Sequence, residues 1–391
     1  MTKISYVCSH PIHYHAELLR RLASIPDIEF EAVFRTDAPL RGAVDLQFGI
    51  PIKWNVNLTD GYRYSVLQPE SSENYGTART LFKLMSYLVN RRPDILWVHG
   101  FSNMYNLLAM IVAKSLRCRV YLRDDVNGKM RNRAWLDNFK SIVIFRLLRI
   151  LVDGFLAVGS ENKRYYLKRG IPGNRIILVP NAVDNEFFQN TTADTAAAHA
   201  TMEQLRSKYK VIVLFCGKLI AVKRVGDLLR ALSHIPKSIG REIAVVVVGE
   251  GECRAQLEAQ AACCGIATYF LGFINQSGLP SIYKSSDVLV LPSASESWGL
   301  VINEAMNGAC AVIATDRVGA AADLIKEGIN GYVYKVGDTV TLGRLLTQLA
   351  SEPDVLKRFK ESSLQIIRSW NYDADIAGLR AAFRLSYDAA E

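Results

Sequence analysis

Short runs of strand-forming residues alternate with helical stretches along most of this chain, and the alternation limits the folds open to it. In the first half, the predicted strands are residues 3–8, 29–35, 95–98, 120–122, 155–158 and 176–179. A second series comprises residues 211–216, 243–248, 268–271, 288–291, 311–314 and 332–334. This rhythm is typical of a parallel sheet with helices on both faces. Because 391 residues exceed what one core holds, the sequence predicts two doubly wound α/β domains.

A stretch of small and polar residues separates the two series. Residues 189–201 read as a linker or a weak helix. The predicted domains are therefore residues 1–188 and 189–371. A helical pattern follows the break at Trp370 and Asn371, and we expect residues 372–391 to form a C-terminal helix that packs back on the first domain.

Composition predicts a cytoplasmic protein with a one-sided charge. No apolar run reaches the roughly 18 residues that span a bilayer, and the N-terminus has no signal-peptide pattern. The seven cysteines form no CxxC pair, so we expect reduced thiols and no zinc. Residues 1–190 hold 26 Lys and Arg against 17 Asp and Glu, whereas residues 191–391 hold 21 of each. The basic half indicates an anionic membrane surface or acceptor; patterns typical of nucleic-acid binding are missing.

The helical region 131–152 has two interpretations. It mixes apolar residues, among them Trp135, Phe139 and Ile142, with Lys140, Arg146 and Arg149. Such a helix either lies on the inner face of the membrane, or covers the sheet with its long cationic side chains pointing outward. The need of an α/β domain for covering helices favours the second interpretation.

The stretch from Pro292 to Gly308 has the pattern of a phosphate site. A strand feeds a turn of small and polar residues, and a helix is predicted from Leu300. The free N–H groups of a helix start bind phosphate, while carboxylates accept hydrogen bonds from hydroxyls. Glu296 precedes the helix start and Glu304 lies inside the helix. This combination suits a diphosphate with a sugar at each end, although a solvated loop Glu and an ordinary helix Glu fit the stretch alone equally well.

Two cations follow the first strand of the second domain. Gly217 lets the backbone approach a ligand, and Lys218 and Lys223 come next. Ligands of parallel sheets bind at the carboxyl ends of the strands, so the two lysines predict a diphosphate clamp there.

In the first domain the same edge carries histidines and a charged pair. His10 and His13 follow the first strand, His99 comes at the end of the strand 95–98, and Arg123 and Asp124 follow residues 120–122. Each histidine either reaches the ligand or serves a structural role. Arg123 and Asp124 either position an acceptor or form a simple salt bridge at a strand end.

Taken in order, these motifs resemble the family 4 glycosyltransferases, which are retaining enzymes with the GT-B fold of two Rossmann-like domains facing each other across a cleft. The resemblance covers most of the second domain, including the two glutamates with seven residues between them, Glu296 and Glu304. The chain departs from the family in the loop 9–15, where many members have a Gly-rich loop. It also departs at Arg123, where many members have a histidine.

The resemblance implies a role for each matched residue. Lys218 and Lys223 would neutralise the donor diphosphate, with the backbone N–H groups of Gly299, Leu300 and Val301 completing the phosphate site. Glu296 would bind hydroxyls of the donor sugar and Glu304 the ribose, while Gly272 and Phe273 mark the place of the nucleobase. The expected catalytic set is Glu296, Lys223, Lys218, His99 and Arg123, and the expected acceptor side holds His10, His13 and Asp124.

The resemblance therefore implies a retaining transferase that moves a hexosyl or N-acetylhexosaminyl group from a UDP- or GDP-sugar to a glycan or lipid-linked acceptor in cell-surface polysaccharide biosynthesis. No metal or cofactor is expected, because lysines and a helix start can stabilise the leaving diphosphate. Two alternatives stay open: a nucleotide-sugar epimerase of the same fold, and a non-catalytic sugar-nucleotide-binding subunit.

Overall fold

The computed structural model describes residues 1–42, 44–45, 50–51, 54–69, 77–127, 135–191 and 196–385. Contacts between residues divide the chain into two compact units. The first unit comprises Met1–Ala43, Val56–Asn181 and Tyr372–Glu391, and the second comprises Val44–Asn55 and Ala182–Asn371. The boundary thus falls after Asn181 rather than after residue 188, and the C-terminal segment belongs to the first unit.

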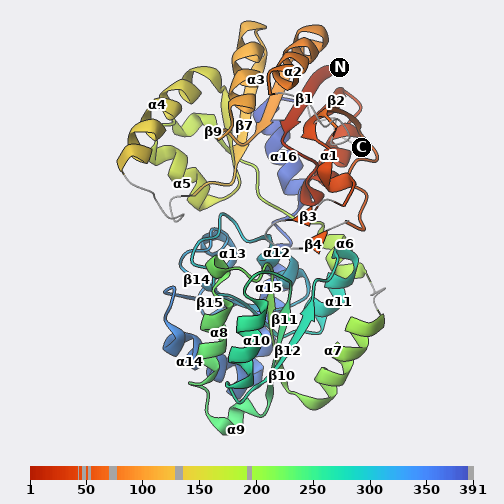
Figure 1. Ribbon diagram of the computed structural model, residues 1–391. Helices are drawn as coiled ribbons and strands as arrows, with labels where there is room; N and C mark the ends of the chain where they lie inside the picture. Colours follow the sequence, from red (N-terminus) through yellow and green to blue (C-terminus); the bar gives the residue numbers. More distant parts are fainter. Residues whose placement is uncertain are drawn as a thin grey trace, which may run out of the picture. The chain divides into compact units, whose positions relative to one another are not determined.

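The first unit is built on a sheet of seven parallel strands (Figure 1). Their order is β5-β2-β1-β6-β7-β8-β9. The bounds are β1 Thr2–Cys8, β2 Ile28–Thr36, β5 Arg63–Gln68, β6 Ile95–His99, β7 Arg119–Asp124, β8 Gly154–Ala157 and β9 Ile176–Leu178. Six of the seven were predicted. The edge strand β5 was missed, because only its Leu67 is buried and its polar sequence lacks an apolar run.

Helices cover both faces of this sheet. They are α1 His13–Ala23, α2 Thr77–Arg91, α3 Met104–Ser115, α4 Trp135–Leu151, α5 Ser160–Lys168 and α16 Tyr372–Phe383, with short 3-10 turns at Ala38–Leu40 and Gly173–Arg175. The buried sides of α2, α3, α4 and α5 share one apolar core with the strands. Tyr121 meets the ring of Phe383 at 4.9 Å between centroids, so the C-terminal helix α16 packs on the sheet as well.

Helix α4 corresponds to the basic helical region of the sequence. Phe145 and Leu148 are buried against the sheet, whereas Ile142, Val143 and Ile150 are exposed. The helix therefore covers the sheet and also presents apolar side chains outward. The side chains of Trp135, Phe139 and Lys140 lie outside the described residues.

The second unit holds a second parallel sheet, of order β12-β11-β10-β13-β14-β15 (Figure 1). All six strands lie where the sequence predicted them. The bounds are β10 Val211–Cys216, β11 Ile243–Val248, β12 Ala267–Gly272, β13 Val288–Leu291, β14 Ala311–Thr315 and β15 Gly331–Tyr334. Every residue of β11 and β13 is buried, as expected of parallel strands that are covered on both faces.

The helices of the second unit connect these strands. They are α6 Asn185–Asn190, α7 Ala196–Lys208, α8 Val225–Leu232, α9 Lys237–Gly240, α10 Arg254–Ala262, α11 Leu279–Lys284, α12 Leu300–Asn307, α13 Ala321–Leu324, α14 Thr339–Ser351 and α15 Pro353–Ile367, with 3-10 turns at Ala221–Lys223 and Gln276–Gly278. The predicted linker 189–201 includes the end of α6 and the start of α7, and residues 192–195 are outside the described residues. A small antiparallel pair, β3 Val44–Asp45 and β4 Ile50–Pro51, also belongs to this unit.

Both sheets reverse their strand order beside one central strand. β1 lies between β2 and β6, and β10 lies between β11 and β13. The loops after these strands diverge at the carboxyl edge of the sheet, which is where ligands of doubly wound folds bind. Within the described parts of the chain, no helix is both long and apolar enough to cross a bilayer.

Candidate active site

The loops after β10 and β11 and the last residue of β12 are held together by backbone hydrogen bonds. The N–H of Gly217 donates to Val248 at 3.0 Å, that of Gly249 to Gly272 at 2.8 Å, and that of Leu219 to Glu250 at 2.8 Å. These bonds extend the pairing of the sheet past the strand ends. The carboxyl edge of β10 is therefore a rigid backbone platform.

Glycine is required at two places in this platform. A Cβ on Gly249 would lie 1.9 Å from the carbonyl oxygen of Gly217, and one on Gly251 would lie 2.5 Å from that of Leu219. Both glycines have positive φ, of 136° and 153°, which disfavours other residues. The GxG pattern thus serves close approach between two backbones.

Lys223 and Glu296 form an ion pair at this edge, between Nζ and Oε2. Lys223 ends the 3-10 turn after β10, and the N–H of Ala294 donates to the carbonyl of Val222 at 2.8 Å, which brings the loop after β13 alongside. The two side chains are 19% and 16% exposed, so the pair is accessible yet shielded from bulk water. The two residues that the sequence assigned to diphosphate and sugar therefore lie together.

The start of α12 lies next to Glu296. Gly299 is the N-cap residue, with φ 97° and ψ 62°, and no side chain caps the helix among the described residues. A Cβ on Gly299 would lie 3.3 Å from Cγ of Glu296. Trp298 is buried, donates its indole N–H to Asn303 at 2.9 Å, and stacks on Trp370 at 5.5 Å. This anchored loop aims the first N–H groups of α12, including those of Leu300 and Val301, at the carboxyl edge.

Glu304 is only 3% exposed and lies inside α12. The hydroxyl of Tyr283 donates to its Oε2. Burial raises the pKa of Tyr283 well above its usual range, and the nearby Cys216 and Glu304 add to that effect. Tyr283 therefore stays a neutral donor to the carboxylate. Tyr283 was not predicted from the sequence, because a tyrosine among the apolar residues of α11 is typical of the buried core.

Lys218 and Phe273 complete the predicted set. Lys218 directly follows Gly217 and is half-buried. Phe273 follows β12, and its ring lies 6.3 Å from that of Trp54. The neighbouring Asn55 donates from its backbone N–H to the side chain of Asn275 at 3.3 Å. We refer to Gly217, Lys218, Lys223, Glu296, Gly299 and Glu304 as the carboxyl-edge cluster.

In the first unit, the carboxyl edge of β1 and β6 carries a cluster of aromatic rings. The ring centroids of His15 and His99 lie 4.7 Å apart, and Nδ1 of His15 is 2.9 Å from the hydroxyl of Tyr6. Nδ1 of His99 is buried and has no hydrogen-bond partner among the described residues. The side chain of Asn106 donates to the carbonyls of His99 and Gly100, at 2.7 and 2.8 Å, and holds this turn in place.

These histidines are neutral near pH 7. Burial lowers the pKa of His99 to about 4, and burial together with His10 lowers that of His13 to about 3. Burial also lowers the pKa of His10 and of His15. Neutral imidazoles exchange hydrogen bonds with uncharged hydroxyls, which suits a sugar better than an anion.

Arg123 is buried in an ion pair that the sequence did not predict. Its guanidinium is 1% exposed and lies 3.1 Å from the carboxylate of Asp375 on α16, with a further bond of 3.3 Å to the carbonyl of Pro180. The partner is thus Asp375 rather than Asp124. This placement favours a structural role over the predicted catalytic one.

Asp124 instead accepts a 2.6 Å hydrogen bond from the N–H of Val126. Burial raises its pKa to about 7, with a smaller contribution from Asp125. It therefore titrates near neutral pH. Its predicted place on the acceptor side stays a prediction.

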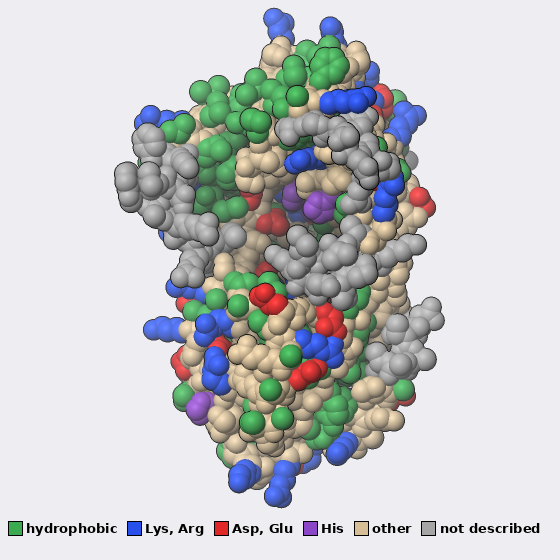
Figure 2. All heavy atoms as spheres, viewed as in Figure 1, with side chains coloured by type: hydrophobic (Ala, Val, Ile, Leu, Met, Phe, Trp, Pro, Cys, Tyr) green, Lys and Arg blue, Asp and Glu red, His purple; other side chains and the backbone are tan. Residues whose placement is uncertain are grey.

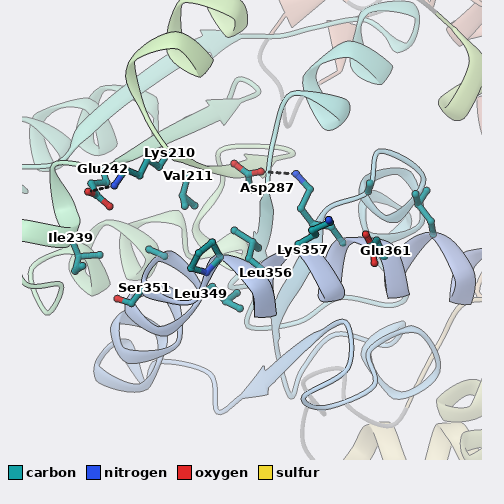
Figure 3. A pocket seen from close by; sticks show the side chains of 15 residues that line it. Lys210, Val211, Ile239, Glu242, Asp287, Leu349, Ser351, Leu356, Lys357 and Glu361 are labelled. Atoms are coloured by element: carbon teal, nitrogen blue, oxygen red, sulfur yellow. Dashed lines mark hydrogen bonds and ion pairs between the residues drawn. The ribbon is translucent and has the colours of Figure 1, made fainter.

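A separate cavity of about 720 Å³ lies at the opposite, amino-terminal edge of the second sheet (Figure 3). It is lined by Lys210, Val211 and Asp287 among others. The carboxylate of Asp287 accepts from Lys360 at 2.6 Å and from the N–H of Ile212 at 2.9 Å. Because its polar centre is satisfied and it lies away from the carboxyl edge, this cavity is not the donor site.

No group of three or more His, Cys, Asp and Glu side chains is placed to hold a metal ion within the part of the chain that the structure describes. At the carboxyl-edge cluster, the positive charge available to bind an anion comes from Lys218, Lys223 and the N–H groups at the start of α12.

Comparison with known proteins gives concordant results. The family model of glycosyl transferases group 1 matches residues 200–365. An uncharacterised glycosyltransferase of Methanocaldococcus jannaschii is 37% identical over 323 residues, which cover 77% of this chain and 78% of the relative. An α-1,4-N-acetyl-D-galactosaminyltransferase of Campylobacter jejuni, named for a PP-undecaprenol-linked acceptor, is 24% identical over 226 residues, covering 57% of this chain and 58% of the relative.

Solved structures with the same two-domain GT-B fold align along nearly the whole chain. The crystal structure of Anabaena HepE in complex with UDP superposes with a TM-score of 0.73, at 15% identity, covering 98% of this chain and 100% of the other. The predicted fold class is therefore confirmed.

Proposed function

This chain belongs to the glycosyl transferases of group 1, and from that premise we propose that it transfers a sugar from a nucleotide-diphosphate donor, with retention of configuration, to a glycan or lipid-linked acceptor. The observation that carries the proposal is the Lys223–Glu296 ion pair beside the uncapped start of α12. It places a cation for phosphate and an acceptor of hydroxyl hydrogen bonds at one sheet edge.

Lys223 serves the diphosphate. A lysine ammonium has three donors, so Lys223 can hold Glu296 and a phosphate oxygen together. Lys218 and the N–H groups of Gly299, Leu300 and Val301 add positive potential where the leaving diphosphate gains charge. These groups stabilise the departure of the diphosphate, and no metal or cofactor is proposed.

Glu296 and Glu304 have separate tasks in this proposal. Glu296 accepts from hydroxyls of the donor sugar, and its position is fixed because its backbone N–H donates to Arg317 at 3.2 Å and its carbonyl accepts from Gly319 at 3.2 Å. Glu304 binds the ribose, since Tyr283 donates to one of its oxygens and a carboxylate accepts several further bonds.

Retention fits a front-face mechanism. The sugar leaves as its bond to the diphosphate breaks, and the acceptor hydroxyl attacks the same face while the departing phosphate takes its proton. The neutral histidines of the first unit, His99 above all, offer hydrogen bonds to hydroxyls of the acceptor.

Two similar proteins support a choice of nucleotide for the donor and of the kind of acceptor. We propose UDP as the nucleotide because HepE, a fold relative, was solved with UDP. A hexosyl or N-acetylhexosaminyl group is proposed as the sugar, and cell-surface polysaccharide biosynthesis as the setting. The Campylobacter relative, named for a PP-undecaprenol-linked acceptor, supports a lipid-linked acceptor. Such an acceptor would place the enzyme in the cytoplasm at the inner face of the membrane.

Isothermal titration with a panel of UDP- and GDP-sugars tests the donor half of the proposal. We expect binding of a UDP-sugar that competes with UDP and is lost in Lys223→Ala. Lys237→Ala is the matched control, because it removes an exposed cation on α9. Failure to bind any nucleotide sugar would refute the proposal.

A further inference from the structure

Helices α2, α3 and α4 each present apolar side chains to solvent. On α2, Phe82, Met85 and Val89 follow one another at intervals of three and four residues, so they form one stripe along the helix. On α4, Val143 and Ile150 lie seven residues apart on one stripe. Eight of the fifteen large apolar side chains that are exposed among the described residues lie on these three helices: Phe82, Met85, Val89, Met104, Ile111, Ile142, Val143 and Ile150.

These stripes lie on one surface. The buried sides of the three helices, represented by Leu88, Met110 and Leu148, share the core on one face of the first sheet. The helices lie in the order α2, α3, α4, and each contacts the next. Their outward sides therefore form one continuous face, and Figure 2 shows apolar side chains gathered over this part of the first unit. We refer to the outward sides of α2, α3 and α4 as the three-helix face.

Among the side chains that the structure describes on the three-helix face, the charges have one sign; Asp137, near the start of α4, lies outside them. Residues 77–92, 104–117 and 142–151 contain no Asp or Glu. They contain eight cations: Arg79, Lys83, Arg91, Arg92, Lys114, Arg117, Arg146 and Arg149. Arg91 pairs with Glu29 at 2.9 Å, and Lys114 pairs with Asp153 at 2.9 Å.

We propose that the three-helix face docks the protein on a lipid bilayer that contains anionic headgroups. The apolar stripes would enter the acyl boundary, while the arginines and lysines meet the headgroups. The inference builds on the proposed function, because a lipid-linked acceptor is held at a membrane. A second copy of the chain is the poorer occupant, since a two-fold interface would set two cationic faces against each other.

Vesicle co-sedimentation of the full-length protein tests this inference. We expect sedimentation with vesicles of phosphatidylcholine and phosphatidylglycerol, and much less with phosphatidylcholine alone. Arg146→Gln should weaken binding to the anionic vesicles about fivefold at low salt, because each cation near such a surface contributes about that factor. The double variant Phe82→Ser/Ile150→Ser should weaken it about tenfold or more at both low and high salt, because it removes buried apolar area.

The double variant Ile329→Ser/Val340→Ser is the matched control. It removes two apolar side chains of the second unit that are 54% and 61% exposed, and it should bind vesicles as the wild type does. Titration with UDP in the same samples reports the donor site independently. If the wild-type protein binds UDP but does not sediment with the anionic vesicles, the docking surface is wrong and the proposed function still stands. Equal losses in both double variants would overturn it as well. So would a concentration-dependent dimer, seen by light scattering, that Phe82→Ser/Ile150→Ser abolishes in a protein that binds no vesicles.

Discussion

At the scale of single residues, the account depends on Lys223 and Glu296. They are 73 positions apart in sequence, yet their side chains meet at the carboxyl edge of the second sheet. The meeting is dictated by the strand order, because β10 and β13 are neighbours in the sheet. The roles that follow are testable by separating phosphate binding from binding of the nucleoside.

Substituting Lys223→Ala should weaken UDP binding about 10- to 100-fold, because a charge-assisted hydrogen bond to phosphate is lost. Uridine should bind the variant as it binds the wild type, since the contacts proposed for uridine, at Glu304, Gly272 and Phe273, do not involve Lys223. Isothermal titration with the two ligands measures both. Equal losses for UDP and uridine would show that Lys223 does not contact the diphosphate.

The buried histidines predict a dependence of stability on pH. The folded-state pKa of His99 is about 4, below the ordinary 6.5, because of burial, with Arg123 and His10 opposing protonation and Asp125 favouring it. Between these values the unfolded chain binds more protons, so the free energy of unfolding falls as the pH drops from 6.5 towards 4. His99→Gln should reduce that fall by about 1–3 kcal/mol in urea unfolding at pH 7 and pH 5. An equal fall in the wild type and in His99→Gln would contradict the assignment.

Some contacts of single residues could be predicted from the sequence and others could not. Lys218, Lys223 and Glu296 were predicted because they follow strands in an ordered set of motifs, and Glu304 because it lies in the predicted helix after Glu296. The partner of Arg123 was not predicted, because Asp375 is 252 positions away on a helix whose packing the sequence leaves open. Tyr283 was missed for the same reason, since its contact with Glu304 depends on how α11 packs on α12.

At the scale of elements, the loops after β10 and β11 are held at a distance that only glycine permits. Their strands were predicted from apolar runs, and the approach of the backbone to a ligand from Gly217. Their mutual contact follows from the sheet order, which the local pattern does not contain. The need for glycine at position 249 therefore becomes apparent only in the folded unit.

Substituting Gly249→Ala should destabilise the protein by about 3 kcal/mol, because the new Cβ meets the Gly217 carbonyl and the positive φ adds strain. Gly265→Ala is the matched control: its φ is also positive, but its Cβ would meet nothing within 4 Å, so we expect about 1 kcal/mol. Chemical unfolding of both variants checks the difference. Similar losses would mean that the close approach of the two loops is not essential.

Helix α16 is joined to the first sheet by the buried Arg123–Asp375 pair. Arg123→Met should destabilise the protein by about 3–5 kcal/mol, because it leaves Asp375 without a cation, and Arg123→Met/Asp375→Leu should recover most of that loss. Thermal unfolding measures both. A stable Arg123→Met that binds the donor but no longer transfers sugar would instead support the catalytic role predicted from the sequence.

At the scale of the whole molecule, each unit contributes different chemistry. The second unit has a cationic platform with two carboxylates, and the first unit has neutral histidines and a basic outer surface. The charge asymmetry was visible in the sequence as a net charge of +9 in residues 1–190 and zero in residues 191–391. The sequence showed the basic charge of this part of the chain but not the apolar surface of the three-helix face, because its apolar stripes belong to three helices that the fold places together.

The most direct test of the central claim is the fate of the donor sugar with water as the acceptor, followed by proton NMR. For an α-linked UDP-sugar bound in the titration, we predict slow release of the free sugar, first as the α anomer, because a retaining enzyme keeps the configuration. Glu296→Gln should abolish that release while UDP still binds. Release of the β anomer first, an epimerised sugar nucleotide, or a bound donor that never turns over would contradict the account.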